Sequence, residues 1–463
     1  MRVHLVGVGG IGMSGLARLL LAQHHAVSGS DPSDNRILQQ LRALGGTIHR
    51  DHKASHVRGV GCVAYSSSIA PENPELLSAR NRGIPVLHRS EMVNRIASGK
   101  KVIAVAGAHG KSTTTALASE LLIAAGLDPT VILGAEMDSL GGNARLGRGR
   151  YLVVEADESD GSFLRLRPAA AIVTNIDDEH LDFYRNSGEI QEAYEIFGSR
   201  IQPDGFLVGC VDDAGVRRLF FNGGRRFISY GFSHEARVTA RDVELGPGWS
   251  RFHCFESGKS LGLVQMRVPG IHNVSNALGL IGLSIGMGIN FRVAQKILQE
   301  FKGTKRRFQI QADLNGILIV EDYAHHPVEI ESTLQAARQW KGRRLRVVFQ
   351  PHRYSRTRFL MDRFASCFRL ADELILLPIY SASEEPVEGI TSRAMLEAVR
   401  AGGHRCVSLQ SPEGVLERLS AETAAGDMIL FLGAGSVGAL AGRLAEILRS
   451  PVSSIQEVPQ HAA

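Results

Sequence analysis

The sequence has few features of a secreted or membrane protein. Its five cysteines, at positions 62, 210, 254, 367 and 406, show neither paired nor metal-ligand spacing and so predict no disulfide framework. The longest apolar stretch near the N-terminus, Leu16–Ala22, contains Arg18 and is far too short to span a membrane. No signal peptide precedes the first predicted strand, Val3–Val6. We therefore expect a reduced, cytoplasmic protein without membrane insertion.

Internal repeats and strong charge are also lacking. The formal net charge is only +5, and the basic clusters at 305–307 and 341–346 have no interleaved aromatic residues. Such local clusters suit small anionic substrates better than nucleic acid. In contrast, 50 glycines and a 44% hydrophobic fraction suit an α/β protein with many strand-to-helix turns. The length predicts about three domains.

The most informative motif is a glycine loop, GAHGKSTTT, which starts at Gly107 between a predicted strand and a predicted helix. Backbone N–H groups of such a loop, together with the positive end of the helix, bind phosphate. Lys111 is placed to reach the outer phosphates, and the Ser112 hydroxyl is placed to ligate Mg²⁺. The usual P-loop has a glycine where Val105 stands, so the motif is a shortened variant. The alternative is a glycine-rich turn with a surface lysine.

Acidic and amide residues follow later strands of the same block. The strand that starts at Tyr151 ends in four carboxylates within six positions: Glu155, Asp157, Glu158 and Asp160. They would repel one another without a cation, so they predict the Mg²⁺-binding counterpart of the loop; a solvated acidic turn is the alternative. His180 follows the next strand and could instead cap a helix. Asn273 and Asn276 could pair with an adenine edge or simply cap a helix.

The N-terminal block has its own glycine turn. The sequence from Gly7 to Gly12 satisfies G-x-G-x-x-G, and Asp31 follows the next predicted strand, where a dinucleotide fold binds a ribose hydroxyl. The same geometry binds any nucleotide diphosphate, so this motif alone leaves NAD and other nucleotides open. Two later strands end near Ser67 and His88, and strand ends are where open α/β sheets bind ligands.

The C-terminal block repeats this arrangement. The strand Ile317–Val320 leads to Tyr323 and His325, and a second strand leads to Arg353 and Arg356. An arginine fork suits a carboxylate, although ordinary surface salt bridges are the alternative. The tail from Ser450 has no hydrophobic period and is predicted to be disordered.

Taken in order, these motifs resemble the Mur ligase family, and within it the members that add L-alanine to UDP-N-acetylmuramate. The resemblance spans almost the whole chain and rests on GVGGIGMSG (7–15), SGSD (28–31), AHGKSTTT (108–115), EADESDGSF (155–163), TNIDDEHLD (174–182), GIHNVSNAL (270–278), RRF (306–308), DYAHHP (322–327) and HRYSRT (352–357). It implies an α/β fold of three domains: a Rossmann-like N-terminal domain at 1–99, a P-loop-type central ATPase domain at 100–303 and a Rossmann-like C-terminal domain at 304–463.

The resemblance also implies a reaction in peptidoglycan precursor synthesis. ATP would phosphorylate the lactyl carboxylate of UDP-N-acetylmuramate, and the amine of L-alanine would attack the acyl phosphate. Mg²⁺ would be held by Ser112, Glu155 and His180, and the catalytic residues would be Lys111, His180, His325, Arg353 and Arg356. The implied ATP-binding residues are Gly107, Ala108, His109, Gly110, Lys111, Ser112, Thr113, Asn273, Asn276 and Arg307. The implied UDP-sugar site comprises Gly9, Gly10, Ile11, Gly12, Asp31, Ser67 and His88. The implied amino-acid site comprises Tyr323, His325, Arg353 and Arg356.

Some positions depart from the family pattern, and alternatives stay open. Ala108 and Ser112 stand where threonines are usual, and Ala324 replaces a glycine, so local geometry there is expected to differ. No lysine lies between Leu181 and Arg200, which agrees with the alanine-adding members. The alternatives are a murein-tripeptide recycling ligase, an NAD-dependent oxidoreductase and a non-catalytic nucleotide-binding regulator. The sequence predicts neither the oligomeric state nor the tolerance for glycine or serine in place of alanine.

Overall fold

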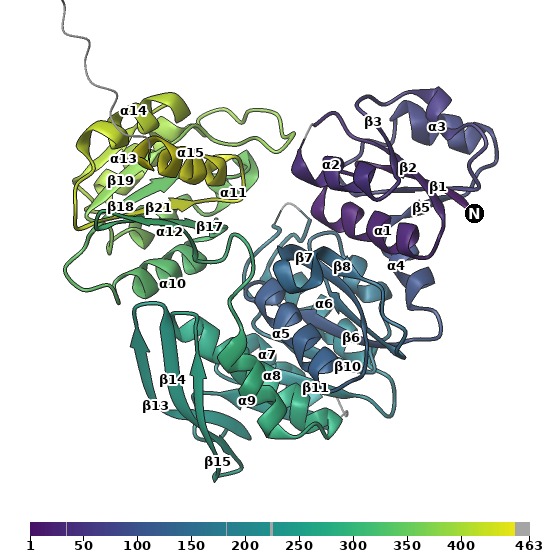
Figure 1. Ribbon diagram of the computed structural model, residues 1–463, viewed down its shortest axis with the longest axis horizontal. Helices are drawn as coiled ribbons and strands as arrows, with labels where there is room; N and C mark the ends of the chain where they lie inside the picture. The colour runs from purple at the N-terminus through teal and green to yellow at the C-terminus, as the bar shows by residue number, and fades with distance from the viewer. Residues whose placement is uncertain (34, 182, 223–225, 450–463) are drawn as a thin grey trace, which may run out of the picture. The chain divides into compact units, whose positions relative to one another are not determined.

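The computed structural model describes residues 1–33, 35–181, 183–222 and 226–449. The predicted disorder after Ser450 lies outside these residues. The chain divides into two compact units, Met1–Lys305 and Arg306–Ala463, and its described residues form three β-sheets (Figure 1). No helix among the described residues is both long and apolar enough to cross a membrane.

The first sheet is fully parallel, with the order β3-β2-β1-β4-β5. The order reverses beside β1, so the glycine turn after β1 lies at the switch point where such sheets bind ligands. The domain is built from β1 (Arg2–Val6), α1 (Ile11–Ala22), β2 (Ala26–Ser30), α2 (Arg36–Ala43), β3 (Thr47–His49), η1 (Ala54–Val57), β4 (Cys62–Tyr65), α3 (Pro74–Asn81), β5 (Val86–His88) and α4 (Arg89–Ala97).

The second sheet has ten strands in the order β15-β14-β13-β12-β11-β10-β6-β9-β7-β8. Its middle strands are parallel, whereas β13, β14 and β15 form an antiparallel meander at one edge. The strands are β6 (Lys101–Ala106), β7 (Thr130–Met137), β8 (Gly142–Arg145), β9 (Tyr151–Glu155), β10 (Ala170–Val173), β11 (Phe206–Cys210), β12 (Arg226–Gly231), β13 (Val238–Gly246), β14 (Trp249–Glu256) and β15 (Lys259–Met266). The helices are α5 (Lys111–Ala124), η2 (Asp138–Leu140), η3 (Ser162–Arg165), α6 (Ser187–Ser199), α7 (Ala214–Asn222), α8 (Ile271–Met287) and α9 (Phe291–Glu300).

The alternation of side chains along β6 shows how the central sheet is covered. Ile103 and Val105 belong to the core cluster that contains the apolar residues of α5 and α8. Ala104 and Ala106 point to the opposite face, where they belong to the cluster that contains Tyr194 of α6. Successive strand residues face opposite sides, so β6 is buried between two helical layers and reads as a continuous apolar run.

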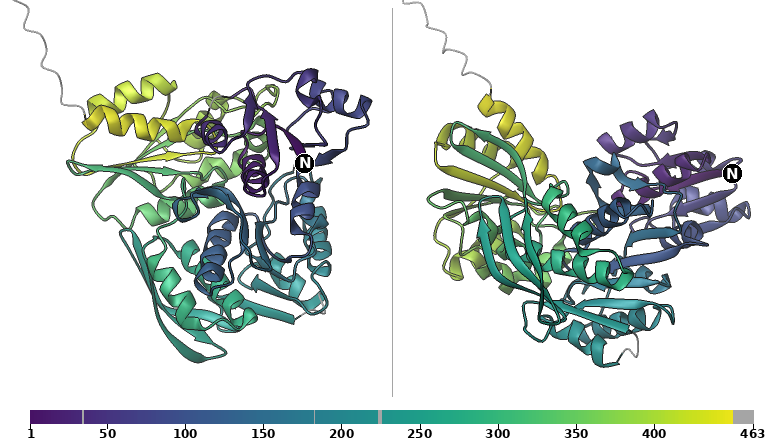
Figure 2. Two further views of the ribbon diagram at one scale, coloured as in Figure 1. Left: turned by 45° about the vertical axis from the view of Figure 1, so that its right-hand side comes forward. Right: turned by 60° about the horizontal axis from the view of Figure 1, so that its bottom comes forward.

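The C-terminal unit has a six-stranded sheet in the order β16-β17-β21-β18-β19-β20, and only β16 is antiparallel to its neighbour. Two separate core clusters, one with α10, α12 and α13 and one with α14 and α15, cover the two faces of this sheet (Figure 2). The elements are β16 (Gln309–Leu314), β17 (Ile317–Asp322), α10 (Pro327–Ala337), β18 (Arg344–Phe349), α11 (Tyr354–Phe359), α12 (Met361–Cys367), β19 (Glu373–Leu376), α13 (Ser392–Ala401), β20 (Val407–Leu409), α14 (Pro412–Glu422), β21 (Asp427–Leu432) and α15 (Val437–Arg449).

Candidate active site

The predicted phosphate loop lies between β6 and α5, and the helix begins at Lys111 itself. Gly107 has φ 133°, and Gly110 has φ 80° at the helix N-cap. A Cβ at Gly107 would lie 1.9 Å from the Thr174 hydroxyl oxygen, and one at Gly110 would lie 2.6 Å from the Asn276 Oδ1. Both positions therefore require glycine for conformation and for space. This tight turn exposes the first N–H groups of α5, which have no partner within the helix.

Lys111 folds back over this loop. Its Nζ donates to the carbonyl oxygens of Gly107 (2.6 Å) and Ala108 (3.0 Å) and to Glu158 Oε1 (2.8 Å). Burial alone would lower the pKa of Lys111, but the Glu158 and Asp157 carboxylates outweigh burial and raise the pKa. Burial raises the pKa of Glu158 to about 7, although the Lys111 ammonium opposes that shift. The ammonium therefore stays charged at the mouth of the phosphate loop.

The four clustered carboxylates have different partners within the chain. Glu155 accepts from the Ser112 hydroxyl (3.1 Å) and from the N–H of Gly134 (2.9 Å). Asp157 pairs with Arg89 (2.9 Å), Glu158 with Lys111, and Asp160 accepts from Ser67. Cations of the protein thus pair with two of the four carboxylates, and hydroxyls donate to the other two. Of the three predicted Mg²⁺ ligands, Ser112, Glu155 and His180, only the first two are hydrogen-bonded to each other.

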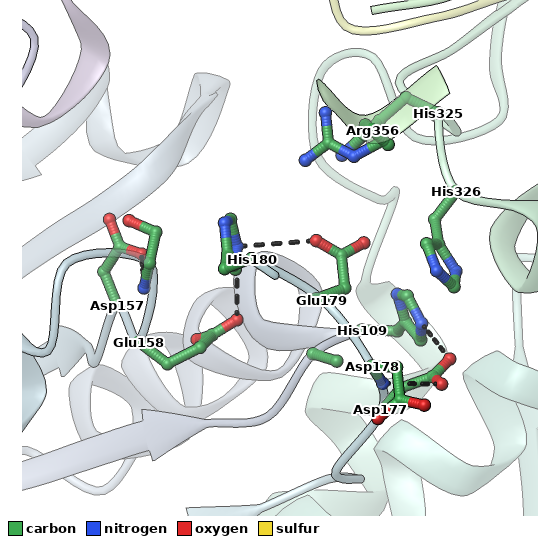
Figure 3. Close-up of polar contacts among 12 residues, drawn as sticks. His109, Asp157, Glu158, Asp177, Asp178, Glu179, His180, His325, His326 and Arg356 are labelled. Carbon is green, nitrogen blue, oxygen red and sulfur yellow. Dashed lines mark hydrogen bonds and ion pairs between the residues drawn. The ribbon is translucent and has the colours of Figure 1, made fainter. Parts of the chain in front are cut away.

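The segment that follows β10 is hydrogen-bonded to the phosphate loop. The His109 carbonyl accepts from Thr174 Oγ1 (2.6 Å) and Asn175 Nδ2 (3.0 Å), and the His109 N–H donates to Asn175 Oδ1 (2.8 Å). The His109 ring lies 3.1 Å from Asp177. His180 lies on the same strand-end segment, with Nε2 3.4 Å from Glu179 and 3.7 Å from Glu158 (Figure 3). The structure therefore places His180 beside the Lys111–Glu158 pair, while its role as a metal ligand stays a prediction.

The two asparagines predicted to lie near adenine are both buried at the start of α8. The Asn273 amide donates to the Pro269 carbonyl (2.7 Å), and the Asn276 amide donates to Asn273 Oδ1 (3.4 Å). Asn276 borders Gly110, so this segment does adjoin the phosphate loop. Neither asparagine caps α8, because its N-cap is Gly270 and no side chain accepts from the first N–H groups of the helix.

The glycine turn of the N-terminal domain is held by Asp31. Its Oδ2 accepts from the Gly9 N–H (2.9 Å), and a Cβ at Gly9 would lie 2.7 Å from the same oxygen. Gly10 caps α1, which starts at Ile11 and contains Gly12. The turn therefore presents the N-terminus of α1 at the switch point of the sheet, a site suited to a diphosphate.

The ends of β4 and β5 meet the acidic segment of the central domain. The Ser67 hydroxyl lies 2.9 Å from His88 Nε2, and Ser67 also donates to Asp160. Arg89 follows His88, borders Gly12 and pairs with Asp157. Burial alone would raise the pKa of Asp157, but the Arg89 guanidinium and the Lys111 ammonium hold it below its usual range. Arg89, which links the N-terminal glycine turn to the central domain, was not among the predicted site residues.

In the C-terminal unit, Tyr323 and His325 follow β17. The two rings are in edge contact with centroids 5.2 Å apart, and His325 Nδ1 lies 3.0 Å from the Tyr323 carbonyl and 3.3 Å from Glu329. Arg307 packs over the Tyr323 ring at 5.1 Å. Ala324, which replaces a glycine of the family pattern, is fully buried and does not have a positive φ. The alanine is therefore accommodated without backbone strain.

The two arginines after β18 have different partners. Arg356 donates to the Nδ1 (3.2 Å) and the carbonyl (3.3 Å) of His352, whereas Arg353 lies 3.9 Å from Glu384. The His352 ring is 6.0 Å from that of His325. Burial, together with His325 and Arg356, lowers the pKa of His352 to about 3, so its ring is neutral and can accept from Arg356. His352 was not among the predicted site residues, although it lies within the HRYSRT motif.

Most of the chain matches known protein families and individual relatives. Residues 2–101 match the family described as "Mur ligase family, catalytic domain", residues 105–284 match "Mur ligase middle domain", and residues 306–435 match "Mur ligase, glutamate ligase domain". The UDP-N-acetylmuramate–L-alanine ligase of Anaeromyxobacter sp. (strain Fw109-5) is 43% identical over 97% of this chain and 98% of its own length. The protein of the same name from Geobacter sp. (strain M21) is 45% identical over 94% and 95%.

Solved structures show the same architecture. The UDP-N-acetylmuramate-alanine ligase of Thermotoga maritima aligns with a TM-score of 0.82 and 29% identity, over 96% of this chain and 98% of that one. A murein peptide ligase of Psychrobacter arcticus aligns with a TM-score of 0.75 and 24% identity, over 98% and 100%. The predicted α/β fold with three domains is therefore confirmed, whereas the individual site residues and the domain boundaries at 99/100 and 303/304 stay predictions.

Proposed function

Because this chain belongs to the Mur ligase family, we propose that it joins L-alanine to the lactyl carboxylate of UDP-N-acetylmuramate at the expense of ATP. The observation that carries the proposal is the phosphate loop with a buried lysine, next to a hydroxyl–carboxylate pair, in a chain that aligns end to end with L-alanine ligases. The cytoplasmic localisation predicted from the cysteines stays part of the proposal.

The central domain would position and neutralise the phosphates of ATP. A carboxylate is a poor electrophile until it is phosphorylated, and phosphoryl transfer needs mainly alignment and compensation of charge. The N–H groups at the start of α5 and the Lys111 ammonium supply both. On binding, the outer phosphate would replace Glu158 as the partner of Lys111, because the two anions compete for one cation.

The residues present fit a Mg²⁺ ion. The Ser112 hydroxyl and the Glu155 carboxylate adjoin each other and offer the oxygen ligands that this ion prefers. When bound, Mg²⁺ would compensate the negative charge of the phosphates. His180 would help hold a second ion; a nitrogen ligand is less usual for Mg²⁺, so this role rests on the resemblance.

The C-terminal domain would bind L-alanine. The Arg356 guanidinium suits the amino-acid carboxylate because it offers a planar pair of donors. His325, fixed by the Tyr323 carbonyl and by Glu329, would orient the amine or accept its proton. Neutral His352 would hold Arg356 without competing for the negative charge of the substrate.

The proposal is tested by phosphate release from ATP with UDP-N-acetylmuramate and a panel of amines. We expect release only when the UDP-sugar, Mg²⁺ and L-alanine are all present. A preference for the tripeptide over L-alanine would instead favour the recycling ligase, which is kept as the alternative because a murein peptide ligase has the same fold. Turnover of NAD with a hydroxy acid, without phosphate release, would refute the proposal in favour of an oxidoreductase.

A further inference from the structure

A carboxylate with no role in the proposed chemistry is buried in the N-terminal domain. Glu75, in the first turn of α3, has no solvent exposure. Its Oε1 lies 3.2 Å from His4 Nε2 and 2.9 Å from His56 Nδ1. Its Oε2 lies 2.9 Å from His52 Nδ1 and accepts from the Ser30 hydroxyl at 2.5 Å. Four side chains from four different segments therefore converge on one carboxylate.

These contacts fix the ionisation state of Glu75. A carboxylate has about four acceptor sites, and all are used here. Burial alone would raise the pKa of Glu75, but the donors His4, Ser30 and His52 lower it to about 2. Glu75 is therefore ionised at neutral pH and only accepts, so each histidine must donate a proton to it. In His52 this proton is on Nδ1, which leaves a lone pair on Nε2 when the ring is neutral.

The cluster lies directly behind the proposed nucleotide site. The Ser30 carbonyl accepts from the N–H groups of Gly7 (2.9 Å) and Val8 (3.2 Å), so the residue that Glu75 binds also holds the glycine turn. The Asp31 N–H donates to the His49 carbonyl (3.0 Å), which ties the end of β2 to the end of β3. With a diphosphate at the turn after β1 and a ribose near Asp31, the next position along the sheet edge lies at β3.

His52 stands beyond the end of β3 and is suited to meet a base there. Its side chain is 23% exposed, and within the described part of the chain its Nε2 has no hydrogen-bond partner. We propose that Glu75 is a positioning residue that holds His52 with Nε2 as an acceptor, so that the N-terminal domain selects a base with a ring N–H donor. Uracil offers such a donor at N3, whereas cytosine has an acceptor at that position.

This inference rests on the proposed function, because it places the uridine diphosphate of the substrate on the first domain. The decisive variant is Glu75→Gln. A carboxamide has one oxygen acceptor in place of two and adds an N–H₂ donor, so it cannot accept from all four neighbours. With its nitrogen toward His52 it supports the opposite tautomer of that ring, with the proton on Nε2. Glu72→Gln is the matched control, because Glu72 is exposed and precedes Glu75 by three residues.

The experiment is calorimetric titration of the full-length chain with UDP, CDP and N3-methyl-UDP. We expect the parent and Glu72→Gln to bind UDP at least ~10-fold more tightly than the other two. For Glu75→Gln we expect a loss of about 10-fold or more for UDP and a UDP-to-CDP ratio near 1, with KM for ATP and L-alanine within about twofold of the parent. Long-range proton–nitrogen spectra of ¹⁵N-histidine-labelled protein, with His52→Gln for assignment, should show the Nδ1–H tautomer in the parent and its loss in Glu75→Gln.

An equal loss of affinity for UDP and CDP in Glu75→Gln would reduce Glu75 to a structural role and overturn the inference, as would a parent that binds the three nucleotides alike or not at all. If Glu75→Gln does not fold, His52→Phe carries the test, since it removes the acceptor and leaves Glu75 with three donors; an unchanged UDP-to-CDP ratio would then overturn the inference. Selection of UDP without phosphate release in the ligase assay would refute the proposed function and leave this inference standing.

Discussion

The pair of Lys111 and Glu158 gives a prediction that joins catalysis to stability. Lys111→Met removes the cation at the phosphate loop, so we expect ATP turnover to be lost. Binding of the UDP-sugar should persist because it is assigned to the N-terminal domain. The same change leaves Glu158, whose side chain is 3% exposed, without its counter-ion. The pKa of Glu158 should therefore rise above its present value of about 7.

The size of the effect depends on pH. Breaking a buried ion pair costs about 3–5 kcal/mol if the remaining charge stays. Glu158 can instead take up a proton, which costs little at pH 7 because its pKa is about 7. At pH 6 to 7 the loss should be only about 1–3 kcal/mol, for the hydrogen bonds to the two loop carbonyls. A carboxyl with a raised folded pKa loses stability as pH rises from its unfolded value through its folded value. The free energy of unfolding of the parent therefore stops falling near pH 7. In the variant it continues to fall with rising pH, so that by pH 9 the variant has lost up to about 2.7 kcal/mol more than the parent.

The measurement is urea unfolding of the parent and Lys111→Met at pH 6, 7 and 9, followed by circular dichroism. We expect the difference in unfolding free energy to widen between pH 7 and pH 9. The control is the double variant Lys111→Met, Glu158→Gln, which has no carboxyl at position 158, so its difference from the parent should stay nearly constant between pH 7 and pH 9. A difference that does not depend on pH, or that is larger at pH 6, would refute the reasoning.

Two further substitutions test the loop and the amino-acid site. Gly107→Ala should abolish ATP turnover and cost more than ~3 kcal/mol in urea unfolding, because the new Cβ would lie 1.9 Å from the Thr174 hydroxyl at φ 133°. Gly126→Ala, with φ 73° and nothing within 4 Å, should cost only about 1–2 kcal/mol and keep full activity; equal effects of the two would contradict this account. Arg356→Ala should raise KM for L-alanine by an amount equivalent to about 2–5 kcal/mol, with KM for ATP nearly unchanged. Discrimination between L-alanine and its amide should fall in parallel, and a defect mainly in ATP or UDP-sugar kinetics would place Arg356 in another site.

Much of the fold and the loop could be predicted because the signals are local. A glycine with positive φ, an apolar strand and the start of a helix each depend on neighbouring residues, so the sequence from Val102 to Ser112 predicted the turn that the structure contains. Contacts between side chains at the ends of different strands were harder to predict from the sequence. Arg89 and His352 lie beside motifs that were recognised, but their partners, Asp157 and Arg356, are known only from the folded chain.

The acidic segment after β9 shows why clustering in sequence is a weak guide to a metal site. The sequence predicted that the four carboxylates need an external cation because they repel one another. However, the last three, Asp157, Glu158 and Asp160, each contact a residue of another element. These partners are Arg89, Lys111 and Ser67. These partners come from more than 40 positions away in the sequence, so no local pattern could reveal them. The consequence is functional as well as structural. Two of these contacts join the N-terminal domain to the acidic segment after β9. If the proposed sites are correct, a change at Asp157 or Asp160 should alter the position of the sugar nucleotide relative to the phosphates while leaving Ser112 and Glu155 intact.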